Sequence, residues 1–364
     1  MTAVDTSARF VREAHAVVRD LLGANLRRYW IDFLITIVVA YAAFAVSLFA
    51  RPLSPMHLVA FVVCGFAMYR AVVFTHEIAH RRGAGFRTFT LAWNLLCGIP
   101  FLMPSFMYGD HQGHHASHAY GTWSDPEYIV HTAGRRGRIL VFLLLPLVYP
   151  ALMAVRFLFL TPLACVSRRM DRLAWTYASS LYVMNESYRR EYDAAASVRS
   201  RWFQEVACSG WAWLVAGLAV TGYIRWETVT KTYLVFLFWI AVNQVRTLVA
   251  HRYANDADAP VSYLDQVLDT NTFPRGKWLP ELWAPVGLRY HALHHLLPML
   301  PYHAMPQAHA RLMQYLPPDS PYHQTVREGL WPALVAVLLD REQLPGLQHA
   351  TLAAMGREDR QGSR

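Results

Sequence analysis

The sequence predicts an all-α, polytopic membrane protein with four transmembrane helices in two hairpins and a cytosolic helical cap. The 364 residues are 54% hydrophobic yet 16% charged, which is too apolar for an ordinary soluble domain and too charged for a chain wholly inside lipid. Four apolar runs are long enough to cross a bilayer, which takes roughly 20 residues. Histidines gather at the ends of these runs and in the polar segments beyond them, which predicts a metal site carried by the cap.

The four predicted spans pair through two short turns. They cover residues 33–50, 58–75, 206–223 and 233–250. The first turn, RPLSPM, contains two prolines and the second is IRWETVTK, so each pair is expected to form a helical hairpin. Two further apolar stretches, 91–104 and 139–163, contain prolines, and we expect interfacial or re-entrant helices there. If the histidines share one site, residues 139–163 must cross the membrane twice or not at all.

The distribution of basic residues predicts the orientation. The two hairpin turns carry only Arg51, Arg225 and Lys231, whereas the opposite helix ends and the long middle segment carry most of the other arginines. By the positive-inside rule, both termini and the middle segment are cytosolic. We expect one domain over residues 1–364, with an amphipathic N-terminus at 1–29, a core at about 30–315 and a polar tail at 340–364.

The composition also narrows the partners. The formal net charge is +9, but the basic residues lie in small groups beside apolar runs, which favours anionic lipid headgroups over nucleic acid. The four cysteines form no CxxC pair, so we predict neither a disulfide framework nor a zinc finger. The first 30 residues are polar and amphipathic, and they predict no cleavable signal peptide.

Three histidine clusters carry the predicted chemistry. They lie in HEIAH, HQGHH and HALHH, and they comprise His76, His80, His111, His114, His115, His291, His294 and His295, with His251 alone at the end of the fourth span. On a helix, histidines three or four residues apart lie on one face, so each cluster can aim its imidazoles together. Neutral imidazole binds iron, zinc or copper, and one zinc needs only about four ligands. Eight or nine histidines therefore suit two metal ions.

The remaining histidines are weaker candidates. We expect ordinary polar or packing roles for His15, His57, His131, His323 and His349. His118, His303 and His309 could support the metal ligands, but a structural role is favoured for them.

In order and separation, the three clusters resemble the histidine boxes of the membrane fatty acid desaturase superfamily, and the stretch HHLLPMLPYHAMPQAHARL resembles the segment after the third box in acyl desaturases. The resemblance covers roughly residues 30–315. It implies that the eight box histidines bind two iron ions and are catalytic, that O₂ is a co-substrate, and that a tunnel holds a lipid acyl chain. It also implies a separate electron-donor protein, ferredoxin-like or a small haem carrier, because no such segment is visible in this chain.

The resemblance implies a ninth ligand at the cytosolic end of the fourth span, which matches His251. The unusually polar end of that span, with Asn243, Gln244 and Arg246, supports this prediction, because such residues are costly in lipid unless they face a polar chamber. One departure concerns the Asn that holds a metal-bound water one helical turn before this histidine in acyl-CoA desaturases. Thr247 stands at that position here, so the role is not transferred.

Charged residues near the boxes are further candidates. Second-sphere carboxylates are expected to fix the imidazole tautomers, and the candidates are Glu77, Asp110, Asp125, Glu127, Asp265 and Asp269. A solvated charge or a helix cap is the alternative for each. Arg70 and Arg246 lie some 8–9 Å deeper than His76 and His251, and they either pair with acidic groups beside the metals or snorkel to the headgroups.

Three functions are compatible with these patterns. The leading hypothesis is an O₂-dependent fatty acyl desaturase, and the second is a hydroxylase of an acyl, alkyl or carotenoid chain on the same scaffold. The boxes do not separate the two. A zinc-bearing membrane receptor or a metal transporter is the non-enzyme alternative. A transporter would place its ligands near mid-membrane, and a receptor would need three or four rather than nine.

Overall fold

The computed structural model describes residues 3–129, 135–180, 185, 187–192, 198–255 and 261–339. Within these ranges every regular element is a helix, and extended segments meet only as isolated β-bridges. The predicted all-α class is therefore confirmed. The predicted polar tail at 340–364 lies outside the described residues.

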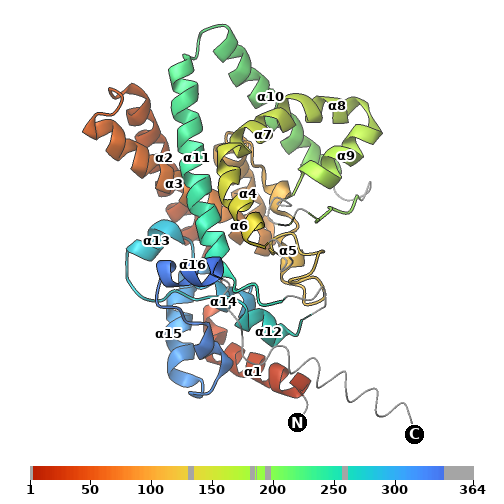
Figure 1. Cartoon of the computed structure of the whole chain (residues 1–364), viewed down its shortest axis with the longest axis vertical. Coiled ribbons are helices and arrows are strands. Elements are labelled where there is room, and N and C mark those ends of the chain that lie inside the picture. The colour runs from red at the N-terminus through yellow and green to blue at the C-terminus, as the bar shows by residue number, and fades with distance from the viewer. Residues whose placement is uncertain are drawn as a thin grey trace.

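Two long antiparallel hairpins form the membrane part (Figure 1). The first joins α2 (Leu26–Phe49) to α3 (Pro55–His80), and the second joins α10 (Val198–Val220) to α11 (Trp226–Ala250). All four helices begin earlier than the predicted apolar runs, since hydrogen-bonded helix continues into polar sequence. The Asn25 side chain caps α2 and the Ser54 side chain caps α3, so each start is set by a local hydrogen bond.

Among the described residues, five helical segments are long and apolar enough to cross a membrane, one more than the four predicted spans. The fifth, Tyr149–Val166, consists of α7 (Tyr149–Val155), a π-helical turn (Arg156–Leu160) and α8 (Thr161–Val166). It follows α6 (Arg135–Leu144), and it precedes α9 (Arg168–Ala178). The stretch at 91–104 is no candidate span, because it breaks into the end of α4 (Ala84–Trp93), a π-helical turn and further turns.

The segment from α6 to α8 doubles back within the helical bundle. Ile139 packs in one cluster with Leu248, near the histidine-bearing end of α11. The backbone carbonyl of Leu147 accepts a hydrogen bond from Tyr233, which lies near the opposite end of that helix. The chain then returns, and Asp171 of α9 pairs with Arg201 at the start of α10. Both ends of this segment therefore lie on the same side as the histidines.

An ion pair fixes the returning arm to α10. The Arg156 guanidinium donates two hydrogen bonds to the Glu205 carboxylate, at 2.7 and 2.6 Å, and both side chains are buried. Thr161 also donates to Glu205. A charge placed among apolar helices is stable only when it is paired and hydrogen-bonded, so this pair anchors the π-helical turn.

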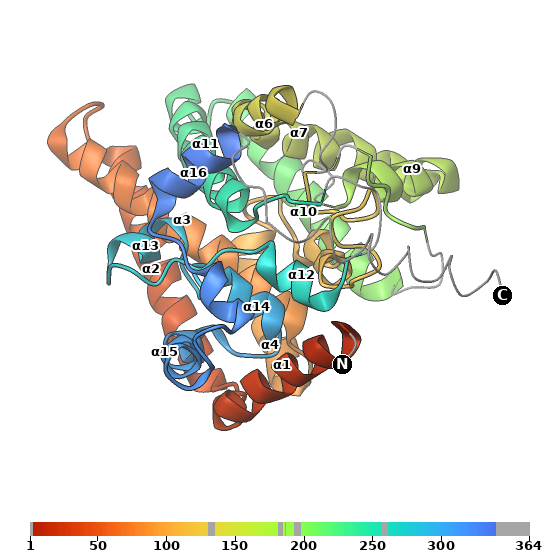
Figure 2. The same cartoon turned by 60° about the horizontal axis from the view of Figure 1, so that its bottom comes forward.

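The cap lies at the end of the bundle where α3 carries His76 and His80 and where His251 follows α11 (Figure 2). It consists of α1 (Ala3–Val18), α12 (Tyr263–Leu268), α14 (His291–Leu296) and α15 (Met305–Tyr315). The amphipathic helix α1 buries Phe10 and Ala14 in the same cluster as Ala308 and Leu312 of α15. Two other short helices, α13 (Leu279–Trp283) and α16 (Leu330–Leu338), pack on α11, and α5 (His111–His114) lies beside α3.

A half-buried ion pair ties the cap to the first hairpin. Arg70 of α3 pairs with Asp32 of α2 at 2.7 Å, and Tyr302 of the cap donates to the same carboxylate at 2.9 Å. The expectation that Arg70 pairs with an acidic group is thus confirmed. Because Tyr302 follows the third histidine cluster in the chain, its hydrogen bond to Asp32 helps to position that cluster over the end of α3.

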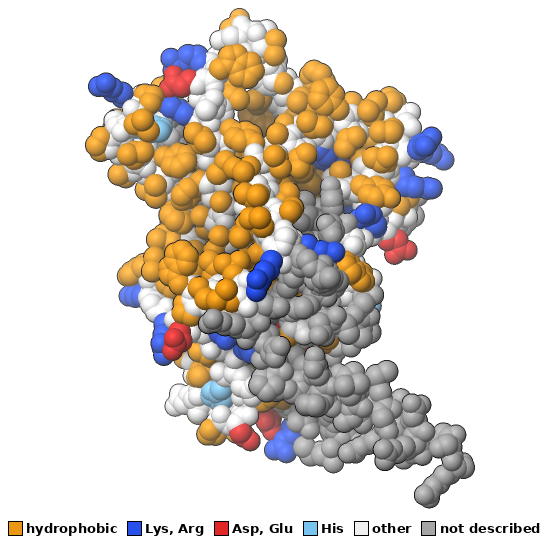
Figure 3. Space-filling model, viewed as in Figure 1, with side chains coloured by type: hydrophobic (Ala, Val, Ile, Leu, Met, Phe, Trp, Pro, Cys, Tyr) orange, Lys and Arg blue, Asp and Glu red, His pale blue; other side chains and the backbone are white. Residues whose placement is uncertain are grey.

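The surface agrees with a multi-pass membrane protein. Apolar side chains cover the flanks of the long helices in a continuous band, and charged side chains gather toward the ends (Figure 3). On α2 alone, Ile35 and Val38 are 60% and 66% exposed. Side chains of this kind require an apolar solvent, which is the bilayer interior.

Candidate metal centre

The first histidine cluster occupies the last turn of α3. His76 and His80 are one turn apart and buried, so their rings lie on the same face, 5.4 Å between centroids. Glu77 lies between them and points elsewhere. It accepts hydrogen bonds from Tyr29 and from the backbone N–H of Tyr302, so it fixes the turn rather than a histidine.

The second and third clusters come from short helices that face this turn. His111 and His114 are on α5, and His115 caps its end. The helix α14 carries His291, His294 and His295, all of them buried. Both helices are only one or two turns long, so their position depends on packing against α3, α11 and α12.

His251 is placed by the chain that follows α11. The helix ends at Ala250, and His251 forms an antiparallel bridge with Thr270. Asn271 extends this pairing by donating its backbone N–H to Ala250 and its side-chain amide to Val249. As a result the His251 Nε2 atom lies 2.9 Å from Nε2 of His291.

Eight of the nine predicted histidines form two adjoining groups. His76, His80, His111 and His294 form one group, and His114, His251, His291 and His295 form the other; within each group the candidate ligand atoms lie within 4.8 Å of one another. His115 lies between them. Its Nε2 is 3.1 Å from that of His111 and 3.0 Å from that of His294, and its ring centroid is 4.3 Å from that of His295.

The nitrogen atoms are arranged as metal ligands would be. Within the described residues, both ring nitrogens of His76, Nε2 of His80 and Nε2 of His114 are buried without a hydrogen-bond partner. Glu127 and Asp125 hold Nδ1 of His111 and His114, which leaves a lone pair on Nε2 of each ring. Nε2 of His251 and Nε2 of His291 lie 2.9 Å apart. Two nitrogens bound at a right angle to one ion about 2.1 Å away would also lie about 3 Å apart. The residues therefore fit two bound cations.

The Asp125 carboxylate raises the pKa of His114, but burial favours the neutral form of several other imidazoles. Burial lowers the pKa of His115, His251 and His295 well below the usual value, and nearby histidines lower it further. The pKa values of His291 and His294 fall for the same reasons. A neutral imidazole has a lone pair to donate, so the ring state suits metal binding.

Two of the six candidate carboxylates contact a ring nitrogen of a candidate metal-binding histidine directly. Glu127 lies 2.8 Å from Nδ1 of His111, and Asp125 lies 2.8 Å from Nδ1 of His114. Asp125 is itself fixed by the backbone N–H groups of Gly121 and Glu127. A carboxylate in this position holds the proton on Nδ1 and leaves Nε2 free.

Asp269 acts through a tyrosine. The Tyr120 hydroxyl donates to Asp269 at 2.7 Å and lies 2.8 Å from Nδ1 of His251, so His251 donates to the tyrosine oxygen. Burial raises the pKa of Asp269 to about 6, and the hydrogen bonds from Tyr120 and Tyr128 oppose that rise. No sequence motif pointed to Tyr120, because it lies 131 residues from His251 in the chain.

The other candidates lie apart from the histidine nitrogens. Asp110 pairs with Arg190 at 3.0 Å, and Asp265 bonds Ser262 at the start of α12. His118 is exposed, His303 accepts from the Asn25 backbone, and His309 contacts Tyr322. His15, His57 and His323 lie outside the two groups, while His131 and His349 fall outside the described residues. Gln266, which sequence reasoning missed, lies 3.1 Å from Nδ1 of His295.

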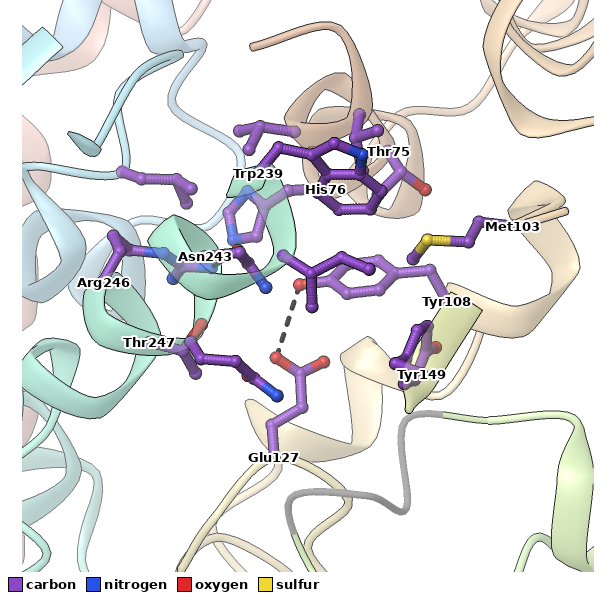
Figure 4. A pocket seen from close by; sticks show the side chains of 15 residues that line it. Thr75, His76, Met103, Tyr108, Glu127, Tyr149, Trp239, Asn243, Arg246 and Thr247 are labelled. Carbon is purple, nitrogen blue, oxygen red and sulfur yellow. Dashed lines mark hydrogen bonds between the residues drawn. The ribbon is translucent and has the colours of Figure 1, made fainter. Parts of the chain in front are cut away.

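A cavity adjoins the centre on its membrane side (Figure 4). His76 lies on its wall, together with apolar side chains that include Val72, Met103, Tyr149 and Trp239. The rest of the wall is polar, with Tyr108, Glu127, Asn243, Gln244, Arg246 and Thr247. The cavity thus has the character needed for a lipid chain that carries a polar group.

Comparison with known proteins agrees with this site. The fatty acid desaturase family model matches residues 52–326, which include all nine histidines. A ceramide hydroxylase of Caulobacter vibrioides (strain NA1000 / CB15N) is 38% identical over 336 residues, covering 92% of this chain and 93% of that protein.

His251 provides the sharpest test of the ligand set, because it belongs to no box. We expect His251→Ala to insert normally into the membrane but to lose bound iron and product as fully as His295→Ala, because one group of four loses a nitrogen. Metal analysis of the purified protein checks this. His303→Ala is the matched control and should keep its metal. Two irons and near-normal turnover in His251→Ala would place the ninth ligand elsewhere.

The carboxylates can be tested against one another. Asp125→Asn removes the charge that orients His114, and we expect a 10–100-fold loss in metal affinity or activity. Asp265→Asn makes the same chemical change at a helix start away from the histidines and should leave both unchanged. Titration of metal-depleted protein with Fe²⁺ measures the difference, and equal affinities in the two variants would contradict the assigned role of Asp125.

Proposed function

The chain belongs to the fatty acid desaturase family, and from that premise we propose that it is a membrane di-iron hydroxylase of a ceramide-like lipid. The similarity to a ceramide hydroxylase over nearly the whole of both chains is the observation that carries this proposal. The mixed apolar and polar cavity beside the histidines supports it.

This proposal reverses the order suggested by the sequence. Desaturation was the leading hypothesis and hydroxylation the alternative, because the boxes are common to both. The relative favours hydroxylation and gives no support to desaturation, which stays the second candidate. Family membership argues for a membrane oxidoreductase and against the zinc receptor and the metal transporter.

The nine histidines are proposed to hold the two iron ions. His76, His80, His111 and His294 would bind one, His114, His251, His291 and His295 the other, and His115 would lie between them. When bound, the iron pair supplies the oxidising power that removal of hydrogen from an unactivated carbon requires. The chain itself keeps several of the imidazoles neutral, fixes ring tautomers through Glu127, Asp125 and Tyr120, and positions the lipid in the cavity.

The proposed reaction balances with a separate reductant. One O₂, two electrons and two protons convert a C–H bond into C–OH and release one water. Desaturation with the same inputs would instead remove two hydrogens and release two waters. A ferredoxin-like protein or a small haem carrier is the proposed source of the electrons.

We also propose four spans, with the active site and both termini in the cytosol. The doubled-back course of residues 135–171 supports an even number of crossings for this segment, since one of its ends packs near the histidine-bearing end of α11 and the other pairs with the start of α10. Arg156, Pro146 and Pro150 favour a re-entrant arrangement over a complete crossing.

Product analysis tests the reaction. Expression in a host supplied with a ceramide should give lipid that gains one oxygen, and growth under ¹⁸O₂ should raise its mass by the label. Purified protein should hold close to two irons per chain. His115→Ala and His295→Ala should abolish the product because each loses a nitrogen of the centre. A loss of two hydrogens would favour desaturation, and full activity with one bound zinc would overturn the mechanism.

Reporter fusions test the topology. Fusions after residues 130, 175 and 364 should all give cytosolic signals, because the segment between the hairpins returns to the side it left. A signal from the opposite side at residue 175 would show that Tyr149–Val166 completes a crossing and would rule out the four-span arrangement.

A further inference from the structure

Arg246 is a buried cation beside the histidine groups, and no carboxylate of the described residues forms an ion pair with it. It lies five residues before His251 on α11, about 8 Å deeper in the membrane part, and is 9% exposed. Its side chain lines the cavity that also contains His76. For both Arg70 and Arg246 the sequence left open pairing with an acidic group or snorkelling; Arg70 pairs with Asp32, whereas Arg246 forms no ion pair with any described residue.

The contacts of Arg246 leave most of its donors unused. A guanidinium has five N–H donors. One is donated to Asn243 Oδ1 at 3.0 Å, and the Tyr69 hydroxyl lies within hydrogen-bonding reach. Across the described residues, no ion pair of Arg246 occurs, and its Nε has no acceptor. By contrast, Arg156 and Arg201 in the same membrane part each pair with a carboxylate.

The carboxylate that shares the cavity is already engaged. Glu127 accepts from Tyr108 at 3.3 Å and holds His111 at 2.8 Å. Asn243, Tyr108 and Glu127 point toward one space, and Arg246 lies beside Asn243 (Figure 4). The α11 side of that space therefore carries the Nε–H donor of Arg246, which lacks an acceptor among the described residues, and the opposite side carries the Glu127 carboxylate. A buried N–H of a charged group without an acceptor, such as Nε of Arg246, is costly, which indicates that a ligand oxygen completes it.

We propose that Arg246, together with Asn243, binds an oxygen of the substrate's polar group inside the cavity. This rests on the proposed function and deepens it, because it specifies where on the lipid the reaction occurs. The apolar wall of Val72, Met103 and Trp239 takes the chain. Since His76 faces the same cavity, the carbon that is oxidised lies within a few bonds of the amide or hydroxyl group, not in mid-chain. Arg246 is a binding and specificity residue in this assignment.

Direct binding tests the proposal independently of turnover. A short-chain ceramide and a hydrocarbon of matched length without amide or hydroxyl groups are titrated into the purified holoenzyme, and tryptophan fluorescence is followed, since Trp239 lines the cavity. Arg246→Met should weaken ceramide binding about 10–150-fold, the usual effect of losing a hydrogen bond to a charged group. It should leave hydrocarbon binding and iron content unchanged. Arg246→Lys should recover part of the loss.

Arg225→Met is the matched control, because it makes the same substitution at the exposed opposite end of α11. Unchanged ceramide binding in Arg246→Met, or equal losses for both ligands, would overturn the proposal, as would a wild-type hydroxyl group placed in mid-chain by tandem mass spectrometry. If Arg246→Met does not fold, Asn243→Leu must show the same selective loss. Intact selective binding without any oxygenated product would refute the proposed function alone.

Discussion

The convergence of nine imidazoles, eight of them buried, is the constraint on which the rest of the structure depends. Neighbouring Nε2 atoms approach one another to about 3 Å, so their protons and lone pairs must be arranged with care. Bound cations between the rings would make this arrangement favourable. The ends of α3 and α11 place their histidines at the centre of the site. Asp125, Glu127 and Tyr120 then fix the rings of His114, His111 and His251 by hydrogen bonds. Fold stability and metal binding are therefore coupled.

The parts of the site that were predictable from the sequence are those set by local geometry. H-x-x-x-H and H-x-x-H-H define a face of one or two helical turns, so the box histidines could be grouped before any fold was known. Asp125 and Glu127 are close to the second box in sequence, and they were two of six candidate carboxylates among which the sequence could not choose. Tyr120 and Gln266 were missed because a tyrosine and a glutamine have many roles, and only the tertiary arrangement brings them to His251 and His295. The two arginines, alike in sequence, differ because Asp32 happens to face Arg70 on the neighbouring helix.

The positions of the four long helices were predicted well from the sequence, and the course of the segment between the two hairpins was predicted less well. An apolar run of about 20 residues identifies a helix that lipid can surround, and this rule identified the helices of both hairpins. Residues 139–166 are equally apolar, but prolines, a π-helical turn and the Arg156–Glu205 pair make them double back. The doubled-back course depends on Glu205, which lies 49 residues after Arg156 in the chain. A hydropathy average over a short window therefore cannot predict it.

The doubled-back segment also forms part of the cavity, since Tyr149 of α7 lines it while no metal ligand lies on α6, α7 or α8. The two histidine groups and this wall of the cavity are therefore separate parts of the fold. In evolution, substitutions in the doubled-back segment can reshape the cavity for lipids of other lengths without replacing any of the nine histidines. The fold can in this way diversify its substrates while its oxidative chemistry stays constant.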